Sequence, residues 1–82
     1  QRRGVLVDAG GYRAQRAELL TRLAGKAADE AIEYSEEIEL EPMSALDRRT
    51  VHMALADRSD IETRSEGEEP RRRIVIVPAQ GA

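Results

Sequence analysis

The amino-acid sequence predicts a small α+β domain of two helices and three strands, preceded by one further short strand. Two observations carry this prediction. Apolar residues recur at helical spacing through 12–34 and again, over a shorter stretch, within 42–55. Strand-like patterns occupy the segments that follow each of these stretches. Eighty-two residues suffice for one domain with a thin core.

The first predicted element is a short apolar strand at residues 4–8, which a pair of glycines at 10 and 11 ends. An unpaired strand is a template for another strand. We therefore expect this segment to lie on a sheet edge or to pair with another chain.

A long helix is predicted at 12–34, because apolar side chains recur at the i, i+3, i+4, i+7 spacing of a buried stripe. The expected stripe consists of Leu20, Leu23, Ala24, Ala27, Ala31 and Tyr34. Gly25 interrupts the helix at a cost of about 1 kcal/mol relative to alanine. Arg13 and Arg16, in the first turns, are either solvated helix charges or an extension of a basic surface.

A strand with one wet face is predicted at 37–41, where acidic and apolar side chains alternate. Ile38 and Leu40 are expected to point to the core of the domain.

The last two strands are predicted at 61–65 and 72–77, with a loop at 66–70 between them. The run 74–77 is apolar on both faces, which indicates a central position in the sheet. Pro78 should end this strand, because proline cannot donate to a strand ladder.

The second, shorter helix is predicted to begin after Ser44, its N-cap, with Asp47 at the third helical position. At 100° per residue one broad arc should face the core. The members of this arc are Leu46, Thr50, Val51, Ala54 and Leu55. Arg48 and His52 stand one turn apart at the edge of the other face, and Arg49 projects further round the polar side.

Composition excludes several kinds of site. The chain has no cysteine, which excludes disulfides and thiolate metal sites and suits a reducing compartment. Its single histidine argues against a histidine metal cage. No apolar run approaches membrane-spanning length, and no signal-peptide pattern opens the sequence.

The formal net charge is −3, but the charges are segregated along the sequence. Acidic side chains predominate at 29–41, where the simplest interpretation is a solvated face. The basic side chains form three groups: Arg2, Arg3, Arg13 and Arg16; Arg48 and Arg49; and Arg71, Arg72 and Arg73. We therefore expect the folded domain to have one basic face.

Two guanidiniums and an imidazole on one side of the short helix suit phosphate oxygens, because a guanidinium offers a planar fork of donors that matches them. In the alternative, structural interpretation, Arg48 makes a surface ion pair with Asp47 or a glutamate, and His52 covers the rim of the core. Catalysis has little support. His52 has no cysteine partner, Ser44 is better used as a cap, and no phosphate-binding glycine loop or Walker lysine occurs.

The residues around this helix resemble a known family. Arg48-x-x-x-His52, within Glu-Pro-Met-Ser-Ala-Leu-Asp-Arg-Arg-Thr-Val-His at 41–52, is similar to the signature of the R3H domain, a module that binds single-stranded nucleic acid. Three more motifs resemble its bacterial Jag (SpoIIIJ-associated) branch, in which a KH domain precedes the R3H domain. They are Asp-Ala-Gly-Gly-Tyr-Arg at 8–13, Leu-Glu-Pro-Met at 40–43 and Thr-Arg-Ser-Glu-Gly-Glu-Glu-Pro at 63–70.

The resemblance implies a domain organisation and a fold. Residues 1–11 would be the C-terminal end of a KH domain, and residues 12–82 would form the R3H domain. The R3H-type fold is a three-stranded antiparallel sheet with two helices packed on one face, and the strand at 4–8 would be additional to it.

The resemblance further implies binding of single-stranded RNA, or of single-stranded DNA. Arg48 would clasp a backbone phosphate, and His52 would contact phosphate or sugar or stack on a base. Additional phosphate contacts are expected from Arg13, Arg49, Arg71, Arg72 and Arg73. Such contacts predict salt-sensitive and largely sequence-tolerant affinity.

Aromatic platforms, each worth on the order of 1–3 kcal/mol per base, are scarce here. The chain has no Phe or Trp, and Tyr12 and Tyr34 lie on the long helix. We therefore expect weak binding by this domain alone, with further affinity from a KH domain in cis or from a separate small KH protein. The family implies no metal or organic cofactor, no membrane contact and no small-molecule substrate. It also implies a cytoplasmic, post-transcriptional regulator linked to cell elongation and division.

Two alternatives remain open at the level of sequence. The first is a protein-interaction module for cell-elongation or division factors, in which the acidic stretch 33–41 matters more than the arginines. The second is a domain that has lost its binding activity and only stabilises its KH neighbour.

Overall fold

The computed structural model describes residues 10–79, and the strand expected at 4–8 lies outside the described residues. Within 10–79 the elements are α1 (Gly10–Tyr34), β1 (Ile38–Glu39), α2 (Ala45–Ala54), β2 (Ile61–Glu66) and β3 (Arg73–Pro78). Two helices and a three-stranded antiparallel sheet confirm the predicted α+β class.

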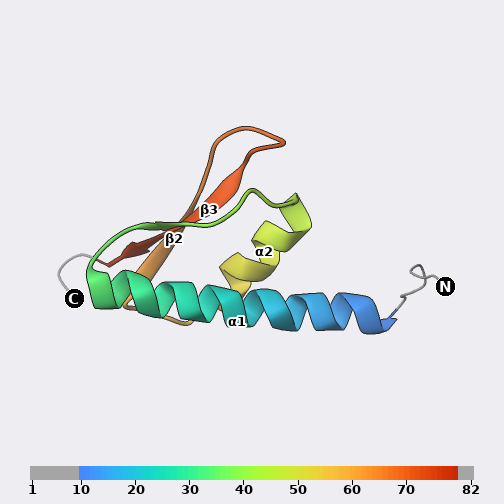
Figure 1. Ribbon diagram of the computed structural model, residues 1–82, viewed down its shortest axis with the longest axis horizontal. Coiled ribbons are helices and arrows are strands. Elements are labelled where there is room, and N and C mark those ends of the chain that lie inside the picture. Colours follow the sequence, from blue (N-terminus) through green and yellow to red (C-terminus); the bar gives the residue numbers. More distant parts are fainter. Residues whose placement is uncertain (1–9, 80–82) are drawn as a thin grey trace.

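The helix α1 runs as one rod beneath the sheet and α2 (Figure 1). Its 25 residues span about 37 Å at a rise of 1.5 Å per residue. The helix ends where Ser35 adopts a positive φ of 53°, and the N–H of Glu36 donates to the carbonyl of Ala31 at 3.1 Å. This hydrogen bond satisfies one of the carbonyls that a helix end leaves open.

Small residues line the side of α1 that packs on the rest of the domain. Its buried side chains are Leu20, Ala24, Ala27, Ala28 and Ala31. The prediction is wrong for Leu23, which is 52% exposed, and for Tyr34, which is 61% exposed. At 100° per residue both lie well to one side of the alanine row, whereas Ala28, which the expected stripe omitted, lies within it.

The strand β3 lies between β1 and β2 and is antiparallel to both, which confirms the predicted central position. Ile76 is in register with Ile38 of β1. Although β1 is shorter than the predicted 37–41, the N–H of Leu40 still donates to the carbonyl of Ile74 at 2.9 Å. The segment that leads to α2 is thereby held along the edge of β3.

The two faces of the sheet have different chemistry. On β3, Ile74 and Ile76 belong to the same buried cluster as the residues of α1 and α2. Val75 alternates to the opposite face, in register with Glu39 and Arg64. Ion pairs lie on this opposite face. Arg64 pairs with Glu66 of the same strand at 3.2 Å and with Glu37, just before β1, at 3.4 Å, and Arg73 of β3 pairs with Glu39 of β1 at 2.5 Å.

The helix α2 begins as predicted. The side-chain oxygen of Ser44 accepts a hydrogen bond from the N–H of Asp47 at 3.2 Å, which satisfies one open donor of the first turn. Val51 and Leu55 are buried, but the prediction that Leu46 also faces the core is wrong, because its side chain is 63% exposed. The core-facing arc is centred on Val51 and Leu55, and Leu46 lies on the far side of the helix.

The turn between α2 and β2 is fixed to α1 by Arg58. Its guanidinium donates to both carboxylate oxygens of Asp60, at 3.0 and 2.8 Å, and to Asp29 of α1 at 2.9 Å. The hydrogen bonds from Arg58 hold the pKa of Asp60 below its usual value. This contact joins α1 to the turn that precedes β2, the strand that carries Thr63.

Candidate nucleic-acid interface

The side of α2 that faces away from the core carries four exposed residues: Leu46, Arg49, His52 and Met53. We call these four residues the outer face of α2. They belong to one side of the helix because residues three, four and seven apart are neighbours on a helical surface.

Arg49 is exposed, and within residues 10–79 its guanidinium has no hydrogen bond or ion pair. The His52 ring is oriented by β2, since its Nδ1 lies 2.5 Å from the hydroxyl oxygen of Thr63. When the hydroxyl donates to Nδ1, the neutral ring carries its own hydrogen on Nε2 and presents it outward. Arg49 thus offers donors for anionic oxygens, and His52 offers one in the tautomer that carries its hydrogen on Nε2.

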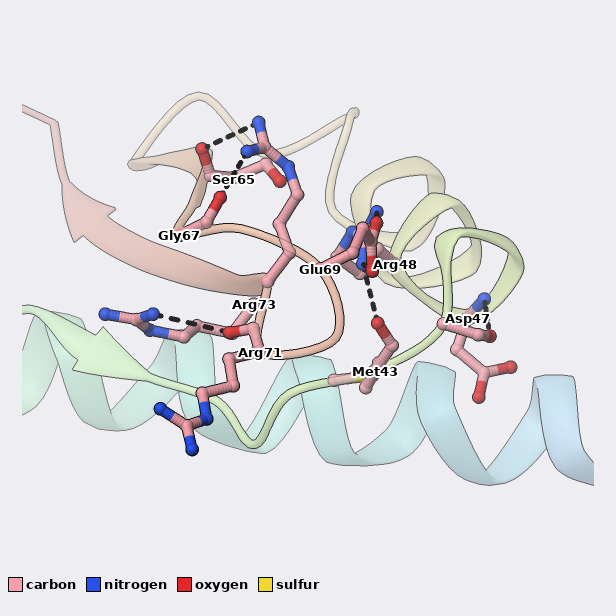
Figure 2. A network of polar contacts seen from close by, with 10 residues as sticks. Met43, Asp47, Arg48, Ser65, Gly67, Glu69, Arg71 and Arg73 are labelled. Atoms are coloured by element: carbon pink, nitrogen blue, oxygen red, sulfur yellow. Dashed lines mark hydrogen bonds and ion pairs between the residues drawn. The ribbon is translucent and has the colours of Figure 1, made fainter.

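Arg48, although adjacent in sequence to Arg49, is turned inward and its side chain is only 11% exposed. Its guanidinium donates to the carbonyl of Met43 at 2.6 Å and to the carboxylate of Glu69 at 2.6 and 3.4 Å (Figure 2). This hydrogen bond, helped by the nearby positive charge, holds the pKa of Glu69 below its usual value.

The ion-pair alternative considered for Arg48 is therefore realised, with Glu69 as the partner. The other carboxylate considered for this pair, Asp47, bonds instead to Arg16 of α1 at 2.6 Å. Direct phosphate contact by Arg48 requires displacement of Glu69 and stays a prediction.

The arginine run at 71–73, which ends the β2–β3 loop and begins β3, is divided among three environments. Arg72 closes the loop by donating to the carbonyls of Gly67, at 2.5 Å, and Ser65, at 3.3 Å. Arg73 pairs with Glu39 on the outer side of the sheet. The guanidinium of Arg71 is exposed and makes no hydrogen bond or ion pair in the described part of the chain (Figure 2).

The predicted site residues therefore do not form one continuous cluster of free cations. Arg48 and Arg72 hold the β2–β3 loop, Arg73 pairs with Glu39 of β1, and Arg49 and His52 share the outer face of α2. Arg13 is exposed in the early turns of α1, and no hydrogen bond or ion pair among the described residues joins it to the other six.

Sequence reasoning missed the two apolar members of the outer face. Leu46 and Met53 are 63% and 61% exposed and stand on either side of Arg49. They border a hollow of about 420 Å³ between α2 and α1, whose lining is Thr21, Leu46, Arg49, Thr50, Met53 and Ala54. The i, i+3, i+7 spacing of Leu46, Arg49 and Met53 was the available signal.

A second and larger groove, of about 500 Å³, follows the other flank of α1. It runs between α1 and the segment from β1 to α2. Its apolar lining includes the exposed Leu19 and Leu23, together with Ile38, Leu40 and Met43. The exposure of Leu23, unexpected from sequence, is a consequence of this open flank.

Two kinds of feature do not occur among the described residues. No helix within 10–79 is long and apolar enough to cross a membrane. The same part of the chain contains no group of three or more acidic or histidine side chains that could hold a metal ion.

Comparison with known proteins identifies the family of this domain. The R3H domain family matches residues 18–78, which include both helices' packed portions and all three strands. The chain is 40% identical over 78 residues to the RNA-binding protein KhpB of Bacillus subtilis (strain 168), covering 93% of this chain and 38% of the relative. It is 38% identical over 73 residues to the KhpB of Lactiplantibacillus plantarum, covering 89% of this chain and 23% of the relative.

A third relative, the KhpB of Clostridium symbiosum, is 39% identical over 72 residues, covering 88% of this chain and 32% of the relative. The chain thus spans about a quarter to two fifths of the length of these relatives, which belong to the Jag-type proteins that the sequence motifs resembled. A family match across three quarters of the chain, over the same helices and sheet that the structure contains, makes this protein a member of the R3H domain family.

Proposed function

We propose that this chain is the single-stranded RNA-binding domain of a Jag-type bacterial regulator, and that it binds through the outer face of α2. The proposal rests on one observation. The Arg49 guanidinium, which has no partner among the described residues, and the His52 ring, which Thr63 orients, lie on the same exposed surface. The family and the RNA-binding names of the relatives support nucleic acid as the ligand.

In this proposal Arg49 donates to backbone phosphate, because its guanidinium has no competing carboxylate among the described residues. His52 donates from Nε2 to a phosphate or ribose oxygen, or stacks on a base. Arg71 and Arg13, which lie away from the outer face of α2, bind phosphates further along the RNA strand. Arg48, Arg72 and Arg73 contribute directly only where RNA displaces the protein groups that they now bind.

The proposal extends to the role of the domain. It is a binding module rather than a catalyst, it requires no cofactor, and it acts in the cytoplasm on RNA. From the resemblance to the Jag branch we also propose that a KH domain ends within residues 1–11, before α1, which already includes Gly10 and Gly11. That domain, or a separate small KH protein, would supply further contacts in the full-length regulator.

The test compares two neighbouring arginines. The affinity of the chain for a short fluorescent single-stranded RNA is measured over a series of salt concentrations for wild type, Arg49→Gln and Arg48→Gln. Loss of one phosphate contact lowers the slope of log K against log salt by about 0.7 for a single strand. We expect this decrease for Arg49→Gln, whereas Arg48→Gln should keep the wild-type slope.

The outcomes separate the possible roles. A lower slope for both variants would make Arg48 a phosphate ligand as well. An unchanged slope and affinity for Arg49→Gln and His52→Ala would exclude the outer face of α2 as the binding surface. If wild type shows no amide shifts on titration with RNA even at low salt, this domain alone does not have the proposed function.

A second candidate function, protein interaction, is favoured by one observation, the larger apolar groove beside Leu19 and Leu23. The acidic stretch supports it less, because Glu37 and Glu39 are engaged by Arg64 and Arg73. Reversing Arg48 and Arg49 to Glu separates the two functions. The double variant should lose RNA binding, whereas loss of a protein partner with RNA binding intact would favour the second function.

A further inference from the structure

The outer face of α2 has an apolar component that phosphate binding does not use. Leu46 and Met53 lie two turns apart and expose more than half of their side-chain surface to water, with Arg49 between them. Such apolar surface is more stable when it is buried against a ligand than when it is left in water. Exposed apolar surface rimmed by polar groups commonly marks a binding site.

These side chains line a shallow hollow that is widely open to solvent. The hollow, about 420 Å³ in volume, extends from the outer face of α2 to Thr21 of α1, and Thr50 and Ala54 complete its lining. Both threonine hydroxyls already donate within their own helices, Thr21 to Ala17 at 2.8 Å and Thr50 to Leu46 at 3.2 Å. Their oxygens can therefore only accept further hydrogen bonds.

The charge of the hollow indicates what it binds. Arg49 is the one cation in its lining, and no acidic residue lines it. The site thus combines apolar walls, hydrogen-bond acceptors and a single cation at the mouth. A nucleotide has the complementary parts, because a flat base with apolar faces and N–H donors is joined to an anionic phosphate.

We propose that the hollow between α1 and α2, walled by Leu46 and Met53 and edged by Arg49, is a subsite for one unpaired base of single-stranded RNA. This inference rests on the proposed function and deepens it. Arg49 holds a phosphate adjoining the base. A base within a duplex is stacked and paired, so it cannot enter, and the subsite therefore selects single strands.

The subsite also accounts for binding without aromatic platforms. Leucine and methionine side chains contact the faces of any base, and methionine adapts its shape to different rings. The walls carry no fixed set of donors that distinguishes one base from another. The geometry therefore points to base contact with little sequence preference.

Methyl-labelled methionine provides the most direct test, because the chain has two methionines. Met53 lines the hollow, whereas Met43 is partly buried against the core and serves as an internal control. On titration with a short single-stranded RNA, the ring current of a bound base should shift the Met53 methyl signal and leave that of Met43 nearly unchanged. Equal shifts, or a shift of Met43 alone, would overturn the proposal.

Mutation gives an independent test with matched controls. The double variant Leu46→Ala/Met53→Ala is compared with Leu23→Ala, which alters an exposed leucine in the other groove. Each is titrated with single-stranded RNA and with an abasic ribose-phosphate oligomer of the same length. We expect the double variant to lose on the order of three- to tenfold affinity for RNA and none for the abasic oligomer. Leu23→Ala should match wild type with both.

Failure of the subsite and failure of the proposed function give different results. If the double variant binds RNA as wild type does, the hollow is not a base subsite, although RNA binding stands. Equal losses for RNA and the abasic oligomer would also reject base contact. If wild type binds neither oligomer, the proposed function itself fails. Loss of an apolar peptide ligand with RNA affinity unchanged would assign the hollow to protein.

Discussion

Arg48 and Arg49 are adjacent in the sequence, yet they belong to two different sides of α2. Arg48 is on the packed side, where it joins the helix to the Met43 carbonyl and to Glu69 of the β2–β3 loop. Arg49 is on the outer face, between two exposed apolar residues and with no partner in the described structure. The difference shows that one residue of helical rotation, about 100°, is enough to separate a structural cation from a free one.

The comparison has a general consequence for motifs of charged residues on a helix. The Arg-x-x-x-His spacing aligns Arg48 with His52 along the helix, but the ring of His52 contacts Thr63 and the guanidinium of Arg48 contacts Glu69. A motif therefore identifies a region of the surface. Which of its members are available to a ligand depends on the groups that other elements bring beside them.

The largest expected difference between the two sides is in stability. Leu55→Ala should lower the free energy of unfolding by about 2–5 kcal/mol, because the side chain is buried and its removal leaves a cavity. Leu46→Ala, the same change in the same segment but on the outer face, should stay within about 0.5 kcal/mol of wild type. Urea denaturation followed by circular dichroism measures both. Similar losses for the two variants would mean that Leu46 is also part of the core.

A second difference concerns the loop that carries Glu69. Gly67 has a positive φ of 92°, and an added Cβ would lie 3.2 Å from the carbonyl oxygen of Arg71 and 2.5 Å from the Arg73 guanidinium. Gly67→Ala should therefore destabilise the domain by about 1–3 kcal/mol. In contrast, Gly25→Ala in α1 meets no atom within 4 Å and should stabilise it by about 0.5–1 kcal/mol.

The glycine variants also test whether the two sides of α2 are independent. Thermal denaturation gives the stability change of each variant. At a temperature where Gly67→Ala remains folded, Arg49→Gln should lower the salt slope of RNA binding by the same amount in the Gly67→Ala background as in wild type, because Arg49 does not depend on the loop. A smaller decrease in the Gly67→Ala background would contradict this separation.

The third prediction compares the two arginines directly. Arg48→Gln removes charged hydrogen bonds to a carbonyl and to Glu69 and should cost about 1–2 kcal/mol of stability. Arg49→Gln should cost less than about 0.5 kcal/mol. Urea denaturation of both variants distinguishes them. If Arg48→Gln is neutral, the contact with Glu69 does not stabilise the packed side.

The smallest expected effect is a pH dependence confined to the packed side. The hydrogen bond from Arg48 lowers the pKa of Glu69 in the folded state below the ordinary value of 4.5. The ionised Glu69 carboxylate therefore contributes its full stabilisation above pH 4.5, the ordinary value, and this stabilisation is lost as the pH falls through the lower pKa of the folded state. The contribution is small because the carboxylate is largely exposed.

Glu69→Gln should reduce the acid-dependent loss of stability, whereas the neighbouring Glu68→Gln should leave it unchanged. Denaturation at neutral pH and at a pH below 4.5 gives the comparison. Identical acid sensitivity of wild type and Glu69→Gln would exclude a role for this carboxylate in the pH response.

Much of the local structure was predictable because short-range patterns encode it. The Ser44 cap, the long helix, the alternation around Ile38 and the central apolar strand at 74–77 all follow from residues close in sequence. Even the two-residue extent of β1 departs from prediction only in its boundaries. The motifs around Arg48 and His52 also sufficed to indicate the R3H family.

The partners of charged residues were not predictable in the same way. Glu69 lies 21 residues after Arg48, and Asp47 lies 31 residues after Arg16. No spacing rule connects such pairs, since only the path of the chain brings them within hydrogen-bond distance. The partners of the arginines at 71–73 were likewise not predictable from spacing, and the structure divides these arginines among a loop, a sheet face and solvent.

By itself, then, the sequence determined which segments become helices and strands, where α2 begins, and how the side chains of each helix are spaced around its axis. The tertiary structure decided the rotation of each helix about that axis relative to the core. It thereby exposed Leu23, Leu46 and Met53 and turned Arg48 inward. The physical reason is that helical periodicity fixes only relative angles within one helix, whereas burial against the other elements selects which side faces inward.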